Sequence, residues 1–400
     1  MLKKHIASSD LKYVINWIRI SLKVVGLWPN SVDEMNWLSQ YGFLIVSFLI
    51  LVVISTPQII SLIMVWPDLN LMMKNLVLLN VPVTTSMIKC FIFGFSKQDV
   101  RPIVDLVVAA WMRPKSDQER ALMMKYATIA KIIYVPFSIA AYASILVNVA
   151  IPFVVYQRAE NISDYINEPF FQTVIIYNIQ NSPIFELTCI VVVIMITLAC
   201  TAYTVIDGFL AMSVLHLCCQ FTNLRNELKS VMTEATMNDG NQFLEKIGLI
   251  VKRHNELIGF SKRVASSYAW TLLVQMTASM LECCFFGFGF IWVFQNDQSS
   301  IAETVFLICA IFVAFAGLYG YCYVSELLCS ENEAIGDTVY DSCWYNLSPK
   351  DARCLLFIIS GSRKQLFVTA ANFCYYSHSL FAAILKTLLG YISILMSISE

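Results

Sequence analysis

The sequence predicts an all-α membrane protein: seven transmembrane helices with cytoplasmic helical extensions that form an anchor region. Of the 400 residues, 58% are hydrophobic and 14% are charged, whereas ordinary soluble domains are about 45–50% apolar and about 25% charged. Mean hydropathy is +0.66, and Lys and Arg collect in alternate connections between long apolar runs. Lipid must therefore surround most of the chain, and its charge pattern indicates no nucleic-acid partner.

Seven apolar runs are long enough to be spans, because an α-helix needs about 20 apolar residues to cross about 30 Å of hydrocarbon. Residues 1–40 lack a short apolar core with a cleavage site, so we expect the first span itself to target the membrane. The third and fourth spans are overlong, which tilt or continuation into the cytoplasm would accommodate. The predicted spans are Tyr41–Trp66, Leu76–Phe95, Ile129–Tyr156, Pro183–Leu215, Tyr268–Phe294, Ile301–Leu328 and Ser377–Ser399.

The distribution of positive charge orients these spans. Five Lys and Arg residues precede the first span, and the second, fourth and sixth connections hold six, seven and four. The first and third connections hold one each and the fifth holds none. The positive-inside rule therefore predicts a cytoplasmic N-terminus and an extracellular C-terminus, opposite to a G-protein-coupled receptor. Asn161, in a glycosylation sequon with Ser163, then falls in an extracellular connection.

Helical periodicity continues outside the spans. Ser116 and Glu119 match a capping box, which predicts that the third helix begins well before the bilayer. Asp351–Gln365 is too short to cross and suits a cytoplasmic or interfacial helix that packs between subunits. Residues 216–267 predict a helical hairpin turning at 238–240, or simply extensions that connect two spans. Its two apolar seams are Leu217, Phe221, Leu224, Leu228 and Val231, and Leu244, Ile247, Val251, His254 and Ile258.

Four segments of the chain form a recognisable series: Val25–Pro29, Ile206–Phe209 continuing to Leu215–Gln220, Trp344–Leu347, and Ser379–Thr387 followed by Tyr391. They resemble signatures of the insect odorant receptor family, and their order extends the resemblance over essentially the whole chain. The gustatory receptor branch is the closest rival. Its last span usually carries Thr-Tyr, five apolar residues and Gln-Phe, whereas here Gly390 precedes Tyr391 and Ser397-Ile398 stands in the later place.

The resemblance implies a subunit of a ligand-gated, non-selective cation channel. Such a subunit assembles with a shared olfactory co-receptor into a heterotetramer in the plasma membrane of sensory neurons, and it needs no cofactor. Residues 1–40 would be a cytoplasmic segment, 41–328 a six-helix ligand-binding bundle that includes the 216–267 hairpin, and 329–400 the anchor segment and pore-lining last helix. A gustatory receptor channel subunit or a membrane transporter is the alternative.

The last span predicts one face of a central pore, because a pore on a rotation axis needs one helix per subunit with the same face inward. Thr387, Tyr391, Ile394 and Ser397 recur there at helical spacing. By the resemblance, Ile394 falls at a hydrophobic constriction and Ser397 at a polar ring just outside it. Ordinary packing or lipid contact is the alternative reading. Lys386, the only charge in this span, should face water.

A small apolar odorant requires a buried site lined by aliphatic, aromatic and Met side chains. The resemblance places this site in the extracellular halves of spans two to six. Core packing alone can also explain each side chain at that depth. The residues selected there are Val83, Thr84, Met87, Ser144, Val147, Val192, Met195, Phe285, Phe288, Cys309 and Phe312.

The remaining polar residues indicate no other function class. Asp207 and Glu282 lie within spans and need water or a partner. His216 is more typical of helix packing than of a metal site, and no enzyme motif or transporter repeat is evident. We therefore predict neither an enzyme nor a metalloprotein. Four acidic residues expected on the cytoplasmic side, either concentrating cations near the pore exits or lying in a solvated loop, are Glu331, Glu333, Asp337 and Asp341.

Overall fold

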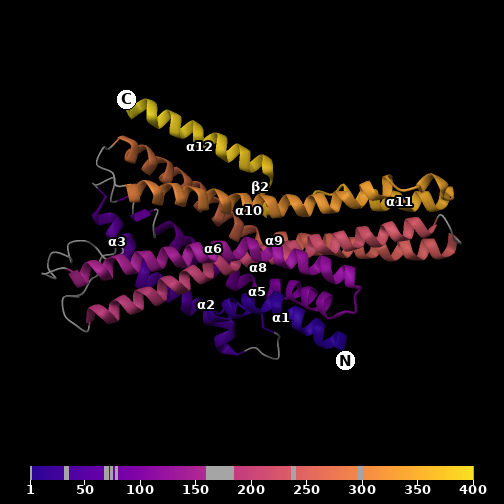
Figure 1. Cartoon of the computed structure of the whole chain (residues 1–400), viewed down its shortest axis with the longest axis horizontal. Helices are drawn as coiled ribbons and strands as arrows, with labels where there is room; N and C mark the ends of the chain where they lie inside the picture. The colour runs from indigo at the N-terminus through magenta and orange to yellow at the C-terminus, as the bar shows by residue number, and fades with distance from the viewer. Residues whose placement is uncertain are drawn as a thin grey trace.

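The structure is a computed structural model that describes residues 2–30, 36–66, 72, 75–76, 80–158, 184–235, 240–295 and 301–399. Long helices run side by side along most of the molecule (Figure 1). They are α1 (Leu2–Val24), α2 (Trp37–Ile50), the π-helical turn η2 (Leu51–Ser55), α3 (Thr56–Met64), α5 (Val81–Met112), α6 (Asp117–Arg158), α8 (Ile184–Ala235), α9 (Gly240–Gln295), α10 (Ile301–Tyr340), the 3-10 turn η5 (Trp344–Asn346), α11 (Pro349–Ser362) and α12 (His378–Ser399).

Every predicted span lies on this helical framework, which confirms the all-α membrane class. The described part of the chain contains five helical stretches that are long and apolar enough to cross a membrane: Ser39–Met64, Asp117–Ala143, Glu186–Thr233, Gln242–Gly287 and Ile308–Tyr340. The second and last predicted spans fall on α5 and α12.

The helices extend far beyond the hydrocarbon. α8 has 52 residues, which corresponds to about 78 Å at 1.5 Å per residue, against a hydrocarbon thickness of about 30 Å. α8 and α9 each continue without a break into residues 216–267, so that hairpin is formed by the ends of two spans. Leu217, Phe221 and Leu228 of the first seam are buried, whereas Leu244 of the second is 40% exposed.

The first predicted span is not one regular helix. The π-helical turn η2 separates α2 from α3, and Pro57 stands near the start of α3. Proline has no backbone N–H and its ring clashes with the carbonyl four residues earlier, which prevents continuous α-helical hydrogen bonding there. Thr56 Oγ1 donates a hydrogen bond of 2.9 Å to the Leu51 carbonyl and satisfies one group at this irregularity.

The sequence also gave no sign of a helix before the first span, but α1 occupies much of that segment. Its residues Ile18 and Leu22 are completely buried, and it packs against α5 and α8. Asp10 of α1 accepts two hydrogen bonds from the Arg120 guanidinium, at 2.6 and 2.9 Å. α1 is therefore fixed to the bundle and is not a loose cytoplasmic tail.

The start of α6 follows the predicted capping motif. The Glu119 backbone N–H donates to Ser116 Oγ at 3.1 Å, and α6 begins at Asp117. The Glu119 side chain turns instead to an ion pair with Arg113, which ends the preceding helix. The connection between α5 and α6 is thus short and held by charge.

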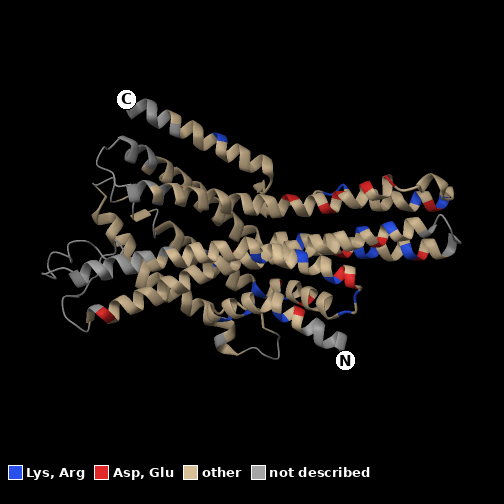
Figure 2. Cartoon of the chain, viewed as in Figure 1, with Lys and Arg blue, Asp and Glu red and all other residues tan. Residues whose placement is uncertain are grey.

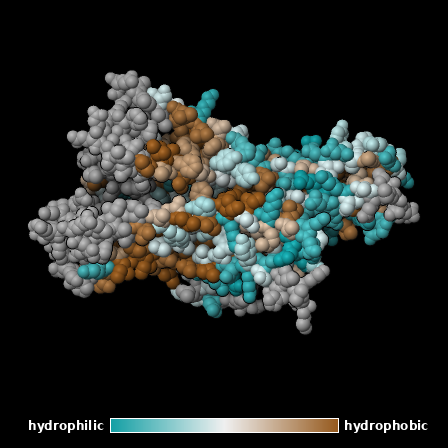
Figure 3. All heavy atoms as spheres, in the orientation of Figure 1, coloured by the Kyte–Doolittle hydropathy of each residue, from teal (hydrophilic) through white to brown (hydrophobic). Residues whose placement is uncertain are grey.

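Charged residues gather at one end of the molecule, which is called here the charged end (Figure 2). It contains α1, the turn between α5 and α6, the end of α8, the start of α9, and α11 (Figures 1 and 2). Apolar surface covers much of the described part of the other half, called here the membrane end (Figure 3). α12 runs away from the middle of the bundle toward the membrane end (Figure 1).

A short β-hairpin is a feature that the all-α class did not anticipate. β1 (Thr369–Ala370) pairs antiparallel with β2 (Cys374–Tyr375). Ala371 and Asn372 between them have φ values of 47° and 64°, in the left-handed region that tight hairpin turns use. The hairpin reverses the chain after α11 and delivers it to the start of α12.

Candidate ligand site and last helix

A compact apolar cluster lies where α2, η2, α5 and α8 meet; we call it the membrane cluster. Ile50, Ile54, Val83, Ile196 and Ala199 are its buried members. Four of the residues selected from sequence therefore come together, since Val83 is in the cluster and three more pack against it. Those three are Met87, Val192 and Met195.

The first span was missing from the predicted site. Ile50 and Ile54 supply two of the five buried members; Ile50 directly precedes the π-helical turn and Ile54 lies within it. Pro57, inside the first apolar run, could have indicated this contribution. A proline distorts the helix, and the distortion changes the direction in which the neighbouring side chains point within the bundle.

Among the side chains that the structure describes, the other selected residues do not join the membrane cluster. Thr84 and Phe285 are partly buried, whereas Cys309 and Phe312 are exposed. Phe312 is 72% exposed. The side chains of Ser144, Val147 and Phe288, and the sequon at Asn161, lie outside the described residues.

An ion pair lies next to the membrane cluster, inside the helix bundle. Lys89 on α5 is completely buried, and its Nζ lies 2.6 Å from Asp207 Oδ1 on α8. The same ammonium donates to Gln275 Oε1 of α9 at 2.9 Å and sits 4.2 Å from the centre of the Tyr203 ring. Gln275 in turn donates to Tyr203 and Ser279. We call these five residues the intramembrane network.

Sequence reasoning anticipated half of this pair. It required a partner for Asp207, but it overlooked Lys89, a single cation in the second apolar run. A charged side chain costs several kcal/mol in the bilayer centre, so that lone Lys was itself the signal. Glu282, two turns beyond Gln275 on α9, also interacts electrostatically with Lys89 and is partly buried.

The last helix packs against the bundle along one stripe near its start. Ile384 and Leu388 are buried, and α12 contacts α9 and α10. The predicted pore residues Thr387 and Tyr391 are exposed, Tyr391 by 58%. The side chains of Ile394 and Ser397 lie outside the described residues. Lys386 is also exposed on this helix.

The four acidic residues that were expected on the cytoplasmic side separate into two groups. Glu331 accepts hydrogen bonds from Tyr126 and Thr222 and lies 3.4 Å from Arg225, so it joins α6, α8 and α10. It is therefore neither in a loop nor free to attract cations. The other three are exposed at the end of α10: Glu333, Asp337 and Asp341.

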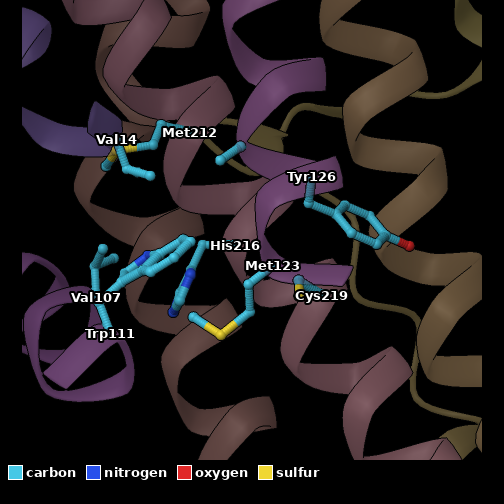
Figure 4. Close-up of a pocket in the computed structure, with 9 residues that line it drawn as sticks. Val14, Val107, Trp111, Met123, Tyr126, Met212, His216 and Cys219 are labelled. Atoms are coloured by element: carbon cyan, nitrogen blue, oxygen red, sulfur yellow. The ribbon is translucent and has the colours of Figure 1, made fainter. Parts of the chain in front are cut away.

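Two cavities near the charged end are poor odorant sites. One is enclosed, has a volume of about 10 Å³, and is lined by His216 and Trp111 (Figure 4). His216 Nε2 and Trp111 Nε1 have no hydrogen-bond partner, and the space is that of about one water molecule. The second, of about 820 Å³, is lined by charged residues such as Arg113, Glu227 and Arg253. The first is mostly apolar but too small for an odorant, and the second lacks the apolar lining that an odorant requires.

Comparison with known proteins decides the family. A profile of the 7tm odorant receptor family matches residues 68–389. The chain belongs to this odorant receptor family. The receptor is thereby assigned to a family of receptors rather than enzymes.

Individual relatives are distant from the receptor. Odorant receptor 22c of Drosophila melanogaster is 24% identical over 207 residues, covering 49% of this chain and 50% of that protein. The receptor thus spans about half the length of that relative, but Odorant receptor 10a of the same fly is 22% identical over 92% of both chains. The olfactory receptor OR5 of Machilis hrabei, solved in complex with eugenol, superposes with a TM-score of 0.78 at 15% identity, covering 97% of this chain and 100% of that one. That likeness concerns the fold.

Proposed function

We propose that the receptor is a subunit of an odorant-gated, non-selective cation channel. It would assemble with an olfactory co-receptor into a heterotetramer in the plasma membrane of sensory neurons. Its N-terminus would face the cytoplasm and its C-terminus the outside. Family membership supports this proposal, as does the gathering of Lys and Arg at the charged end that contains α1.

The odorant would bind at the membrane cluster, and the meeting of Val83, Met87, Val192 and Met195 there carries this part of the proposal. Aliphatic and Met side chains make a deformable apolar site, which suits small volatile ligands. The cluster lies at the membrane end of α5 and α8, away from the charged cavities. Because it is closely packed, a ligand must open space within it, and that displacement is what would favour the open channel.

The site is tested by expressing the receptor with the co-receptor in cells that lack G-protein signalling. Currents are recorded against a panel of alcohols, esters, aldehydes and phenols that includes eugenol. Met87→Ala should change the half-maximal concentration (EC50) of the most potent panel member about tenfold, the effect of about 1–3 kcal/mol of lost contact. Met112→Ala, an exposed Met on the same helix, is the matched control and should change nothing. If the two variants had the same EC50, the membrane cluster would be excluded as the odorant site.

The pore would be lined by the exposed face of α12, with Thr387, Tyr391, Ile394 and Ser397 toward the axis. Ile394 would form the hydrophobic constriction that closes by dewetting. Ile394→Ala should then raise the current in the absence of odorant several-fold. An unchanged leak at normal surface abundance would exclude Ile394 from the gate.

Orientation has its own test. A tag on the last residues should be accessible on intact cells, because an odd number of spans puts the two termini on opposite sides. Labelling only after permeabilisation would contradict the topology and the channel with it.

A further inference from the structure

Tyr376 connects the helices around the intramembrane network to the last helix. Its ring centre lies 5.6 Å from that of Tyr321 on α10. Tyr376 is completely buried and stands two residues before α12 begins. Its hydroxyl donates a hydrogen bond of 3.0 Å to the Leu272 carbonyl, about one turn before Gln275 on α9. Tyr376 therefore contacts both helices that border the network on this side.

The start of α12 is fixed at the same level. The Tyr376 backbone N–H donates to the Val368 carbonyl at 3.0 Å. The His378 N–H donates to Glu326 Oε2 of α10 at 3.1 Å, and its ring stacks on Tyr319 at 5.7 Å. A movement of α9 relative to α10 must consequently move the first turn of α12.

At its other end the network adjoins the membrane cluster. Met87 stands two residues before Lys89, and Ser86 Oγ donates to the carbonyl of Ala199, a cluster residue. Lys89 uses its ammonium for Asp207, Gln275 and the Tyr203 ring, while both amide hydrogens of Gln275 are engaged. Buried polar groups so completely paired have few alternative arrangements, so a displaced α5 would carry its partners with it.

We propose that Tyr376 is a positioning residue for gating. Through its hydrogen bond to α9 next to Gln275, it connects the intramembrane network to α12, so that an odorant in the membrane cluster changes the position of the pore helix. The inference rests on the proposed channel function and adds the route by which the two sites are coupled. Couplings between sites in proteins commonly amount to about 5–150-fold in affinity, which sets the size of effect to look for.

Tyr376→Phe tests the route, because it removes the bond to the Leu272 carbonyl and keeps the ring beside Tyr321. Tyr375→Phe is the matched control, since Tyr375 is adjacent and 57% exposed. Each variant is expressed with the co-receptor, and surface abundance, EC50 and maximal current are measured with the most potent panel member. Tyr376→Phe should keep its surface abundance within about twofold, raise EC50 about fivefold, the effect of one net hydrogen bond, and lower the maximal current. Tyr375→Phe should match the wild type in all three.

A purely structural tyrosine would behave differently. If Tyr376→Phe reduced surface abundance but left the EC50 of the remaining channels unchanged, the inference would be wrong. Wild-type EC50 and maximal current at normal abundance would overturn it equally. A wild-type pair that passed no current with any panel member would instead refute the proposed function, and this inference would fall with it.

Gln275→Leu supplies a second measurement. It removes the hydrogen bonds that join Gln275 to Lys89, Tyr203 and Ser279, but leaves Lys89 paired with Asp207 and over the Tyr203 ring. In a double-mutant cycle with Tyr376→Phe, the two changes in EC50 should be non-additive by at least about threefold, because residues in one network are coupled. Additive effects would show that the network and Tyr376 act independently, and would contradict the route.

Discussion

The two halves of α8 have the same kind of apolar sequence and opposite surroundings. Near the membrane end, Leu187, Ile190 and Ile194 are all more than 48% exposed. Toward the charged end, every residue from 208 to 222 is buried, enclosed by α1, α5, α6, α9 and α10. A helix that is apolar all round can face either lipid or a protein core. Hydropathy alone therefore does not show where α8 leaves the membrane.

The comparison indicates which half holds the fold together. The charged end contains much of the larger apolar core, which is centred on α8 and also extends into the spans at Phe93 and Cys283. The membrane end has the small membrane cluster and the intramembrane network, with apolar side chains facing outward. We expect mutations to reduce stability mainly at the charged end, and to affect the ligand response mainly at the membrane end.

Truncating a large side chain at each end measures this difference directly. Phe221→Ala at the charged end removes a completely buried ring and should cost about 3–5 kcal/mol. Phe312→Ala at the membrane end removes a ring that is 72% exposed, so it should leave stability nearly unchanged. Surface abundance and the melting temperature in detergent report both. Equal losses would show that the membrane end depends on contacts of its own, such as those with a neighbouring subunit.

Variants of the Lys89–Asp207 ion pair test whether this one site at the membrane end contributes as much to stability as the core of the charged end. Lys89→Met leaves Asp207 without its cation, and breaking a buried pair in this way costs about 3–5 kcal/mol. The double variant Lys89→Met/Asp207→Leu removes both charges and should recover much of the lost surface abundance. If the double variant were as poorly expressed as the single one, packing around Lys89 rather than its charge would be the cause.

A polar junction at the charged end should have an intermediate effect. Asn332 accepts a hydrogen bond from His254 and donates to the carbonyls of Ser362 and Lys364, so it joins α9 and α10 to the end of α11. Asn332→Ala leaves these buried groups unpaired and should cost about 1–3 kcal/mol. Asn346→Ala, in the exposed η5 turn, is the control. A wild-type melting temperature for Asn332→Ala would show that α11 is held by apolar contacts alone.

The smallest effect is expected where α1 joins the bundle. The hydrogen bonds from Arg120 lower the pKa of Asp10 below its usual 3.8. A lowered pKa in the folded state means that this contribution is complete above pH 3.8 and is lost as the pH falls below it. Asp10→Asn should therefore lower stability by about 1 kcal/mol at pH 7 and less at pH 3. If the stability difference between Asp10→Asn and the wild type were as large at pH 3 as at pH 7, the ion pair would not be its cause.

The sequence was sufficient for the framework, and the reasons for its success are specific. Seven long apolar runs can only be helices in lipid, and the capping residue Ser116 marked the true start of α6. The hairpin seam of Phe221 and Leu228 was visible because its spacing is helical. These are local signals, and each requires only neighbouring residues.

Features that depend on distant partners were harder to predict. The membrane cluster joins Ile50 to Val83 and Ile196, which are separated by 33 and 146 residues, and no periodicity connects them. Likewise Asp207 required a partner, yet nothing in its own helix pointed to Lys89. Phe312 was selected by depth alone, and depth does not distinguish an inward side chain from an outward one.

The packing of α12 has a mechanical consequence. Beyond Leu388, its last buried residue among those described, the helix runs eleven residues to Ser399, or about 16 Å. A rotation of about 10° about its foot would displace the far tip by about 3 Å over that length. A small rearrangement at the packed start of α12 therefore produces a larger displacement at its far end.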